Sequence, residues 1–406
     1  MAPLVRRAPI LVLAFVGLRT LDASAQSLRL GADAVAQTNA PSPAGLLVLQ
    51  GEDRRRTWLS VEGLVWTGAR PDGAGTSPGE HGRNVDGDIL SLSGRLRAPR
   101  GLGDLRGGRF VLSTGAIRPI HMDGLAALAR APSGTSVEVF GGTPVAARLR
   151  DRSYDWLVGG RVAQSVSTRG VLGLSYLGRR SRGDIADEEI GADLAMVPVR
   201  WIDLAARSAY DLSSPGVADA HASVAARRAS LRVEAFASHR SPGRLLPATS
   251  LFSVLGDLPS RTAGATVRWD AAPRLDLLAS AAGQTVGGDP GGNAWLRATL
   301  RLDDGGEGRL GVEARRQDVS SARWTGLRLI GAHPLGRGLR VSSELELVLP
   351  DAPRGRGAVW PWGLLALGWR SGTGWEAAGA VEAASTPERR AEVNALARLS
   401  RTLELP

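Results

Sequence analysis

The segment LRATLRLD, residues 296–303, alternates apolar and polar side chains without interruption. Successive side chains of an extended strand point to opposite sides, so its leucines share one face and Arg297, Thr299 and Arg301 share the other. One face suits lipid or a protein core, and the other suits water. The segment therefore predicts a β-strand at a boundary between an apolar and an aqueous environment.

The same alternation recurs in segments from Trp201 to Leu405, each followed by a turn. Charges of both signs occupy the polar face, so neighbouring strands can place Arg opposite Glu or Asp. In a closed sheet this face would line a channel. The residues predicted from the alternation to line it are Arg232, Glu234, Arg297, Arg301, Arg309, Glu313, Arg315, Arg340, Glu344, Glu346, Arg390, Glu392 and Arg398.

Three features favour a membrane barrel over a soluble sheet. Tight turns alternate with longer polar connections, as on the two rims of an outer-membrane barrel. The apolar face is mainly Ala, Val and Leu, without the bulky aromatic residues of a sandwich core. Aromatic girdles are expected at membrane interfaces, and the tryptophans near predicted strand ends include Trp201, Trp269, Trp295, Trp324, Trp360, Trp362 and Trp375.

The predicted fold class is all-β, a transmembrane antiparallel up-and-down β-barrel. Counting segments from residue 57 to residue 404 gives about 20 strands, or about 18 if short early strands merge. An even number of strands places both termini in the periplasm.

The N-terminus predicts export to the outer membrane of a Gram-negative bacterium. Two arginines at positions 6 and 7 precede the apolar run 10–18, and the small residues of Ala-Ser-Ala at 23–25 fit a cleavage site before Gln26. The run is shorter than the roughly 20 apolar residues of a membrane-spanning helix. The predicted organisation is a signal peptide at 1–25, an N-terminal periplasmic segment or small plug at 26–53, and the transmembrane barrel at 54–406.

The composition of the chain limits the classes of partner that are expected. The chain has no cysteine, which excludes a disulfide scaffold and a thiolate metal site. All 50 basic residues are Arg, which a GC-rich genome explains, so the basic pI does not indicate nucleic acid. The arginine runs 54–56 and 179–180 are interpreted as rim charges that meet lipid head groups. Outer-membrane lipid is therefore an expected partner, and no nucleic acid is expected.

An enzyme is not indicated. The five histidines show no metal-ligand spacing. His221 and Ser223 have the His-x-Ser spacing that resembles outer-membrane phospholipases, in which a base and a nucleophile share a strand face. Both are predicted to point into the lumen, whereas a lipid hydrolase needs them toward the bilayer. No catalytic residue, cofactor or metal is predicted.

The longest predicted outward loop, residues 241–260, carries many large apolar side chains. A purely solvated loop would rarely carry so many. Two interpretations are open. In one, the loop folds into the lumen and constricts it, with Arg244, Leu251 and Phe252 as constriction residues. In the other, it forms a short hairpin or helix on the rim.

Residues 107–145 carry an ordered series of short motifs: Gly107-Gly108-Arg109-Phe110, then Met122-Asp123-Gly124, then Val137-Glu138-Val139-Phe140-Gly141-Gly142 with Pro144-Val145. This order resembles the early strands of alginate-export-type outer-membrane porins, where a Gly-Arg strand, an Asp-Gly turn and an outward strand follow one another. The resemblance implies a conduit for polysaccharide or oligosaccharide in which Arg109 and Asp123 line the channel.

The predicted function is an outer-membrane porin-like channel for passage or export of anionic or polyhydroxylated solutes, polysaccharide among them. Guanidinium groups match the geometry of carboxylates, phosphates and sugar hydroxyls. In a second interpretation, the same arginines pair with Glu and Asp and stiffen the wall. A different class of function also stays open: a non-conducting barrel that acts as scaffold or sheath for a periplasmic export or electron-transfer partner.

Overall fold

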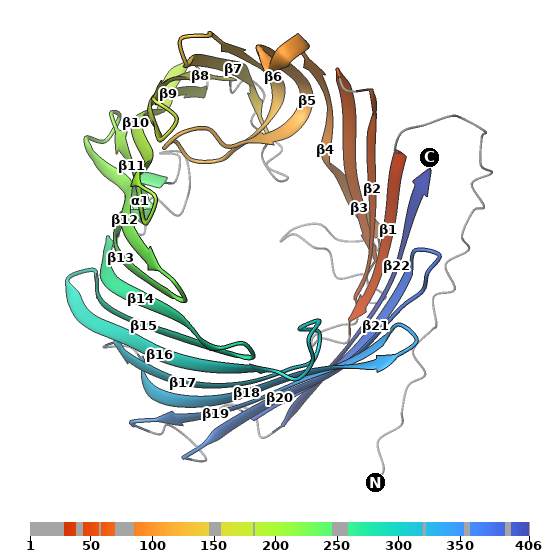
Figure 1. Cartoon of the computed structure of the whole chain (residues 1–406). Helices are drawn as coiled ribbons and strands as arrows, with labels where there is room; N and C mark the ends of the chain where they lie inside the picture. The colour runs from red at the N-terminus through yellow and green to blue at the C-terminus, as the bar shows by residue number, and fades with distance from the viewer. Residues whose placement is uncertain are drawn as a thin grey trace.

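A computed structural model describes residues 28–37, 44–56, 58–69, 85–145, 156–181, 183–245, 259–319, 322–352, 358–385 and 391–405 of the chain. These residues form one sheet of 22 antiparallel strands. Each strand pairs with its neighbours in sequence, and β1 (Leu28–Gln37) also pairs with β22 (Glu392–Leu405), which closes the sheet into a barrel (Figure 1). The predicted all-β antiparallel up-and-down barrel is confirmed.

The other strands follow in chain order. They are β2 (Ala44–Arg56), β3 (Leu59–Ala69), β4 (Val85–Arg97), β5 (Gly103–Leu112), β6 (Ile120–Arg130), β7 (Thr135–Pro144), β8 (Trp156–Val166), β9 (Gly170–Ser181), β10 (Asp184–Val199), β11 (Ile202–Asp211), β12 (Gly216–Arg228), β13 (Leu231–Arg240), β14 (Ser260–Ala272), β15 (Leu275–Val286), β16 (Asp289–Arg301), β17 (Arg309–Val319), β18 (Ala322–Gly336), β19 (Leu339–Pro350), β20 (Trp360–Arg370) and β21 (Trp375–Ala384). Two short helices, η1 (Pro99–Gly101) and α1 (Pro242–Leu245), lie in connections. In the described part of the chain, no helix is both long and apolar enough to cross a membrane.

The region predicted to be a periplasmic segment or plug, 26–53, instead supplies two strands of the wall. β2 pairs with β3, and β1 joins β2 to β22. These two strands account for the difference between the roughly 20 predicted strands and the 22 observed. The alternation did not reveal β2 because residues 46–49 are apolar on both faces.

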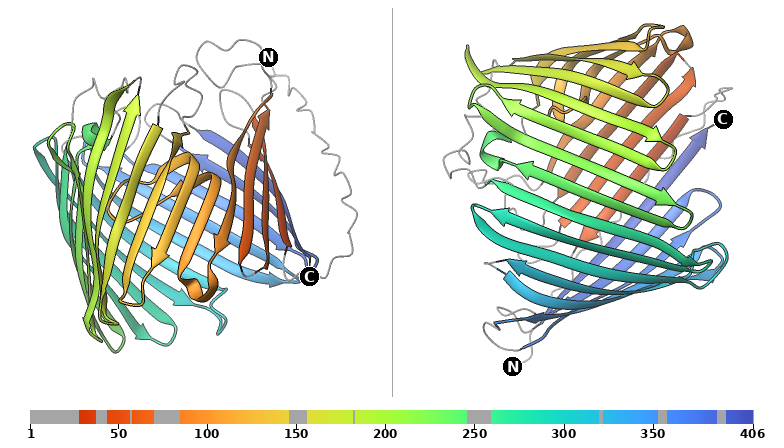
Figure 2. Two further views of the ribbon diagram at one scale, coloured as in Figure 1. Left: turned by 90° about the horizontal axis from the view of Figure 1, so that it is seen from above. Right: turned by 60° about the vertical axis from the view of Figure 1, so that its left-hand side comes forward.

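The two ends of the described chain meet at one rim, because Leu28 pairs with Leu405. We call this the terminus rim and the opposite one the far rim. Connections at the terminus rim are short, such as 229–230 and 337–338, whereas the far rim has the longer connections 70–84 and 145–155. The strands cross the wall at a tilt to the barrel axis (Figure 2).

Alternation along the strands gives the wall two chemically different faces. The outer face presents valines and leucines that are widely exposed, including Leu174 at 64%, Leu365 at 59% and Val393 at 66%. Apolar surface this extensive marks contact with lipid or with another protein. The inner face carries charged side chains, such as Arg297 opposite Glu313.

A band of tryptophans marks the terminus rim, as expected at a membrane interface. Trp269 and Trp369 share the outer face with the exposed leucines. The members of the band are Trp58, Trp201, Trp269, Trp369 and Trp375.

Four other tryptophans differ from the girdle expectation. Three of them lie near strand ends and Trp295 lies in the middle of β16, and the strand register places all four side chains on the inner face. They are Trp295, Trp324, Trp360 and Trp362.

Gly108 of β5 has a backbone conformation that requires glycine. Its φ is +117°, and a Cβ there would collide with the carbonyl oxygen of Leu92 on β4. We expect Gly108→Ala to destabilise the barrel by about 1–3 kcal/mol from backbone strain alone. Urea unfolding of the refolded barrel, followed by tryptophan fluorescence, measures the loss.

Gly94 of β4 is the matched control. It has no positive φ, and a Cβ there would meet no atom within 4 Å. Gly94→Ala should change stability by less than about 0.5 kcal/mol. Equal destabilisation by both substitutions would contradict the assignment of strain to Gly108.

Candidate functional site

The polar face predicted from the sequence is the inner face, and it surrounds the lumen. Arg297, Glu313 and Arg328 lie side by side on it in cross-strand register. Arg390 lies outside the described residues. The predicted residues that the structure places on the inner face are Arg232, Glu234, Arg297, Arg301, Arg309, Glu313, Arg315, Arg340, Glu344, Glu346, Glu392 and Arg398.

Glu313 is the centre of a charge network in the wall, and its side chain is only 1% exposed. Arg297 Nε donates to Glu313 Oε2 at 2.6 Å, and Arg315 also donates to this carboxylate. Arg328 lies 3.9 Å from the same carboxylate and pairs with Glu344. A buried charge needs paired and hydrogen-bonded partners, so this network fixes its side chains against the wall.

Ion pairs also involve other predicted lumen arginines. Arg301 pairs with Asp276 at 2.8 Å, and Arg398 pairs with Asp33 at 2.6 Å. Arg232 similarly pairs with its neighbour on the same strand at 3.0 Å. The interpretation that these side chains pair along the wall therefore describes most of them.

Two predicted arginines differ from this pattern. Arg309 begins β17 and Arg340 lies at the start of β19, so both are at the terminus rim. Both are exposed, and neither forms an ion pair with another of the residues that the structure describes. These two guanidinium groups are thus available to a solute at this end of the lumen.

Arg340 lines a polar pocket of about 390 Å³ at the terminus rim. Arg370, Arg398, Glu307 and Glu376 also line it. Arg370 pairs with Glu376 at 2.6 Å. The lining therefore holds more guanidinium groups than carboxylates, which favours ligands that accept hydrogen bonds.

Asp303, the last residue of the alternating segment, lies in the turn between β16 and β17. It accepts hydrogen bonds from the backbone N–H groups of Gly308 at 2.5 Å and Glu307 at 3.0 Å. These donors lower the pKa of Asp303 below its usual value. Its carboxylate thus stabilises a turn and does not line the lumen.

Arg109 and Asp123, the two residues that the porin resemblance assigns to the channel, form an ion pair between β5 and β6. Phe110 and Met122 are buried, and Arg109 and Asp123 lie opposite each other on the other face of these two strands. Arg109 makes two hydrogen bonds to the Asp123 carboxylate, each 2.8 Å long. Arg109 Nη1 also lies 3.2 Å from Asp88 Oδ1 of β4, and Asp88 pairs with Trp66 in the register of the inner face. The assignment of Arg109 and Asp123 to the channel therefore stays a prediction.

Arg109 lies beside a gap in the strand pairing. β4 pairs with β5 only over residues 92–97, so the preceding part of β4 has no partner on β5. Arg109 Nη1 donates to the Ile89 carbonyl oxygen at 2.9 Å, and His121 Nε2 lies 2.7 Å from the Leu90 carbonyl oxygen. Unpaired backbone groups at the surface of a membrane barrel are costly, and these side chains replace part of the missing strand.

The connection between β5 and β6, residues 113–119, folds inward across the lumen face of β7 to β10 (Figure 1). We call it the inward loop. Thr114 hydrogen-bonds to Glu138 of β7. A Cβ added at Gly191 of β10 would meet the Cβ of Ala116 at 2.9 Å, so the loop lies against the wall there.

Arg118 holds the inward loop to β10. Its backbone N–H donates to Glu189 Oε1 at 3.2 Å, and its Nε donates to Glu189 Oε2 at 3.1 Å. Its Nη2 lies 2.5 Å from Asp187 Oδ2. The Glu189 side chain is fully buried. Because a buried carboxylate depends on its cationic partner, this contact anchors the loop.

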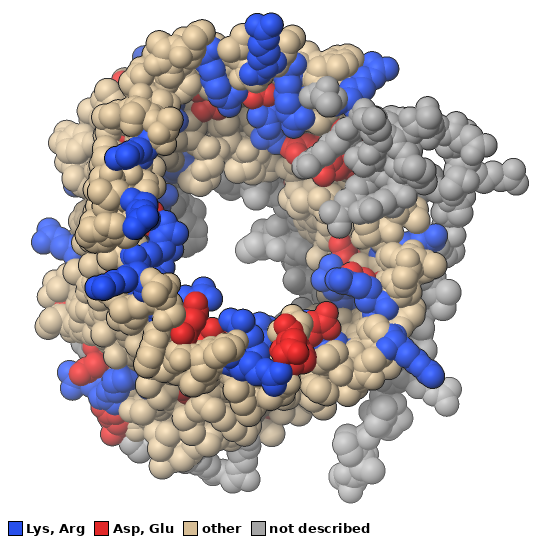
Figure 3. Space-filling model, viewed as in Figure 1, with Lys and Arg blue, Asp and Glu red and all other residues tan. Residues whose placement is uncertain are grey.

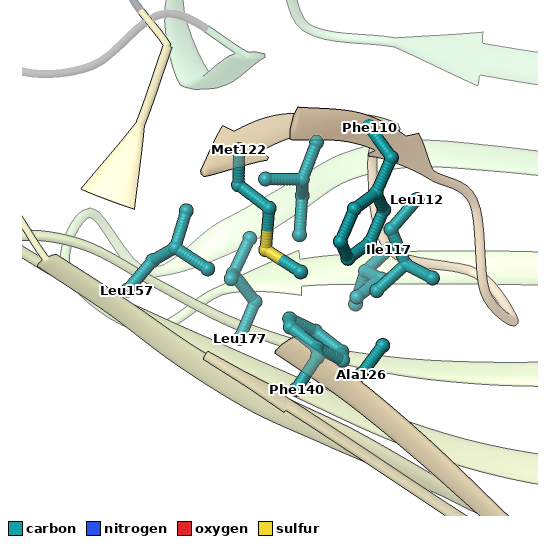
Figure 4. Packing of buried hydrophobic residues seen from close by; sticks show 9 residues of the cluster. Phe110, Leu112, Ile117, Met122, Ala126, Phe140, Leu157 and Leu177 are labelled. Atoms are coloured by element: carbon teal, nitrogen blue, oxygen red, sulfur yellow. The ribbon is translucent and has the colours of Figure 1, made fainter. Parts of the chain in front are cut away.

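An apolar cluster packs beneath the inward loop, on the lumen side of the wall (Figure 4). Phe110 and Met122 are completely buried in it. Burial of large apolar side chains stabilises the loop in its inward position by the hydrophobic effect. The cluster consists of Phe110, Leu112, Ile117, Ile120, Met122, Ala126, Phe140, Leu157 and Leu177.

The inward loop was not predicted from the sequence. In one of the two interpretations of the sequence, constriction of the lumen was assigned to residues 241–260. Leu251 and Phe252 lie outside the described residues. Arg244 lies in α1 and donates to the carbonyl oxygen of Ser214 in the neighbouring far-rim turn. In the structure, Phe110, Leu112 and Met122 place large apolar side chains on the face that carries mainly polar side chains in the other strands, but this face becomes known only from the strand register.

The described residues leave an aperture along the barrel axis, and arginine and carboxylate side chains gather around it (Figure 3). Within the described ranges, no group of three or more His, Asp or Glu side chains is placed to hold a metal ion. The arrangement offers a water-accessible passage with polar walls, narrowed on one side by the inward loop.

No protein-family model and no curated protein sequence matches the chain. Among solved structures, it is similar to the translocation pore of the P pilus usher PapC, with a TM-score of 0.54 and 9% identity over 94% of this chain and 100% of that one. It is also similar to the siderophore receptor PirA from Pseudomonas aeruginosa, with a TM-score of 0.58 and 8% identity over 94% and 81%. The outer membrane protein OpdK from the same organism has a TM-score of 0.41 and 12% identity over 93% and 99%. The first two likenesses establish the fold alone: a large closed barrel of the kind found in Gram-negative outer-membrane proteins.

Proposed function

We propose that this protein is a porin-like channel of the bacterial outer membrane that passes anionic or polyhydroxylated solutes, polysaccharide among them. The observation that carries the proposal is the combination of an open aperture with a charged inner face and an apolar outer face. A barrel whose outer face contacts lipid and whose inner face is polar can enclose a water-filled channel, as porins do.

The proposed compartment follows from the same features. The tryptophan band at the terminus rim suits a membrane interface, and the segment 1–25 has the pattern of a signal peptide that is removed before Gln26. The exposed outer leucines then contact outer-membrane lipid.

The proposed solute class rests on the lumen arginines. Arg309 and Arg340 at the terminus rim are free of ion pairs among the described residues, and Arg340 lines the polar pocket. A guanidinium group presents five donors in a rigid fork that fits carboxylate and phosphate oxygens. Several weak sites of this kind permit passage without trapping the solute.

Reconstitution of residues 26–406 into planar bilayers tests the proposal. We expect discrete ohmic conductance steps and a reversal potential that favours anions in a salt gradient. Arg309→Gln combined with Arg340→Gln should reduce the anion preference while conductance persists. A heat-modifiable, β-rich protein that inserts without conducting would reject the channel.

A partner-filled barrel is the second candidate, and the aperture along the barrel axis favours it. The similar usher barrel is described as a translocation pore and has been captured with PapD, PapK and PapG. A barrel that conducts only after a periplasmic protein is removed would support a sheath over a porin.

A further inference from the structure

Tryptophan side chains line one side of the lumen, from β16 to β20. Trp295 and Trp360 are the two ends of one cross-strand row, with Arg315, Gly326 and Val348 between them. A second row, one step closer to the terminus rim, consists of Arg297, Glu313, Arg328, Glu346 and Trp362.

Trp324 adds a third ring to the first row. The backbone of Trp324 lies one cross-strand row nearer the far rim than Gly326. A Cβ added at Gly326 would nevertheless meet Trp324 Cζ3 at 2.9 Å. The indole of Trp324 therefore lies over Gly326. We call Trp295, Trp324, Trp360 and Trp362 the tryptophan strip.

Polar contacts hold the rings of the strip in place. The Arg297 guanidinium carbon lies 5.6 Å from the centroid of the Trp295 ring. Trp362 Nε1 donates to Glu382 Oε1 at 2.6 Å. All four tryptophans are half-buried, so each ring packs on the wall and leaves part of its surface facing the lumen.

The strip is longer than a single small solute. Four strand spacings separate β16 from β20, which is roughly 19 Å. Because barrel strands are tilted, a row at right angles to them is inclined along the channel axis. The rings thus follow a path along the passage, with charged side chains directly beside them.

We infer that the tryptophan strip is an oligosaccharide-binding site on the lumen wall. This inference rests on the proposed channel function and names its solute class. A sugar ring has an apolar C–H face, which an exposed indole face covers, and a rim of hydroxyls, which Arg315, Arg328 and Glu346 can meet as donors and acceptors. Consecutive sugars of one chain reach successive rings, which a small aromatic or carboxylate solute cannot do.

The experiment records current blockade of single reconstituted channels by maltohexaose and by hexagalacturonate. A polyethylene glycol of similar size serves as the probe for simple exclusion. We expect at least one hexasaccharide to produce resolved blockades that the glycol does not. The double variant Trp324→Ala and Trp360→Ala should weaken this blockade about tenfold, as loss of two aromatic contacts implies, while the open-channel conductance persists.

Two further variants separate sugar binding from a structural effect. Trp324→Phe with Trp360→Phe keeps aromatic faces and should retain most of the blockade. Trp269→Ala with Trp369→Ala removes outer-face rings and should leave blockade unchanged.

Titration calorimetry of the detergent-solubilised barrel with the same hexasaccharides runs in parallel. Conductance without blockade by either sugar, or blockade that survives loss of Trp324 and Trp360, would reject oligosaccharide binding by the tryptophan strip but not the channel function. Absence of conductance overturns the channel, and calorimetry then decides the strip: heat of binding that disappears in the double Ala variant upholds it, and no binding rejects it.

Discussion

Removal of residues 114–118, with the gap closed by two glycines, raises the single-channel conductance of the reconstituted barrel. The inward loop lies across the lumen face of β7 to β10, so its removal widens the passage. Arg118→Ala should also raise the single-channel conductance, but by less than the deletion. It leaves the carboxylates of Asp187 and Glu189 buried without their cation, which costs about 3–5 kcal/mol, and the loop should detach and make the current noisy.

A reversible crosslink is the matched control for the loop. The chain has no native cysteine, so Ala116→Cys with Gly191→Cys creates a single possible disulfide between loop and wall. A Cβ at Gly191 would lie 2.9 Å from that of Ala116. The Cβ atoms of a disulfide are about 3.5–4.5 Å apart, so the loop must move away from the wall by roughly 0.6 Å to allow the bond. Oxidation should leave the conductance of this variant unchanged and suppress the noise caused by Arg118→Ala. A loop deletion with wild-type conductance would show that the loop does not narrow the passage.

Glu313→Gln destabilises the barrel and makes it more selective for anions. The side chain is 1% exposed and is shared by Arg297 and Arg315, with Arg328 nearby. Loss of its charge leaves these guanidinium groups without a common counter-ion, at a cost of about 3–5 kcal/mol. Urea unfolding in lipid vesicles measures the stability, and the reversal potential in a salt gradient measures the selectivity.

Glu376→Gln is the control for this substitution. Glu376 is 43% exposed and, among the described residues, pairs with Arg370, which is 75% exposed. An exposed ion pair contributes about 1 kcal/mol or less. If both glutamates give the same small loss of stability, the Glu313 network does not hold the wall.

The alternation in residues 296–303 predicted both the strand and its faces, because a wall between lipid and water needs opposite chemistry on its two sides. The same rule failed for β2, where Leu46 and Val48 face inward beside outward leucines. Periodicity detects a strand only where the two environments differ. Closure of the barrel was therefore not predicted, although β1 itself alternates, with Asp33 on the inner face and Leu30 and Ala32 on the outer face.

The site was predicted less completely than the fold. The inner arginines were identified by alternation, but their partners depend on the register between strands, which the sequence does not specify. Arg109 and Asp123 were assigned to the channel from a motif, and their ion pair likewise depends on the register between β5 and β6. The inward loop, residues 113–119, resembles an ordinary turn in the sequence, and its position depends on the apolar cluster around Met122, which only the three-dimensional structure shows.

The most direct test of the central claim, that the inner face lines a water-filled passage and the outer face contacts lipid, is a cysteine scan of residues 296–301 in reconstituted vesicles. Each single variant is treated with a membrane-impermeant thiol reagent, against the background of a chain without cysteine. We predict labelling at 297, 299 and 301 and protection at 296, 298 and 300. Labelling without this period of two, or protection at all six positions, would contradict the claim.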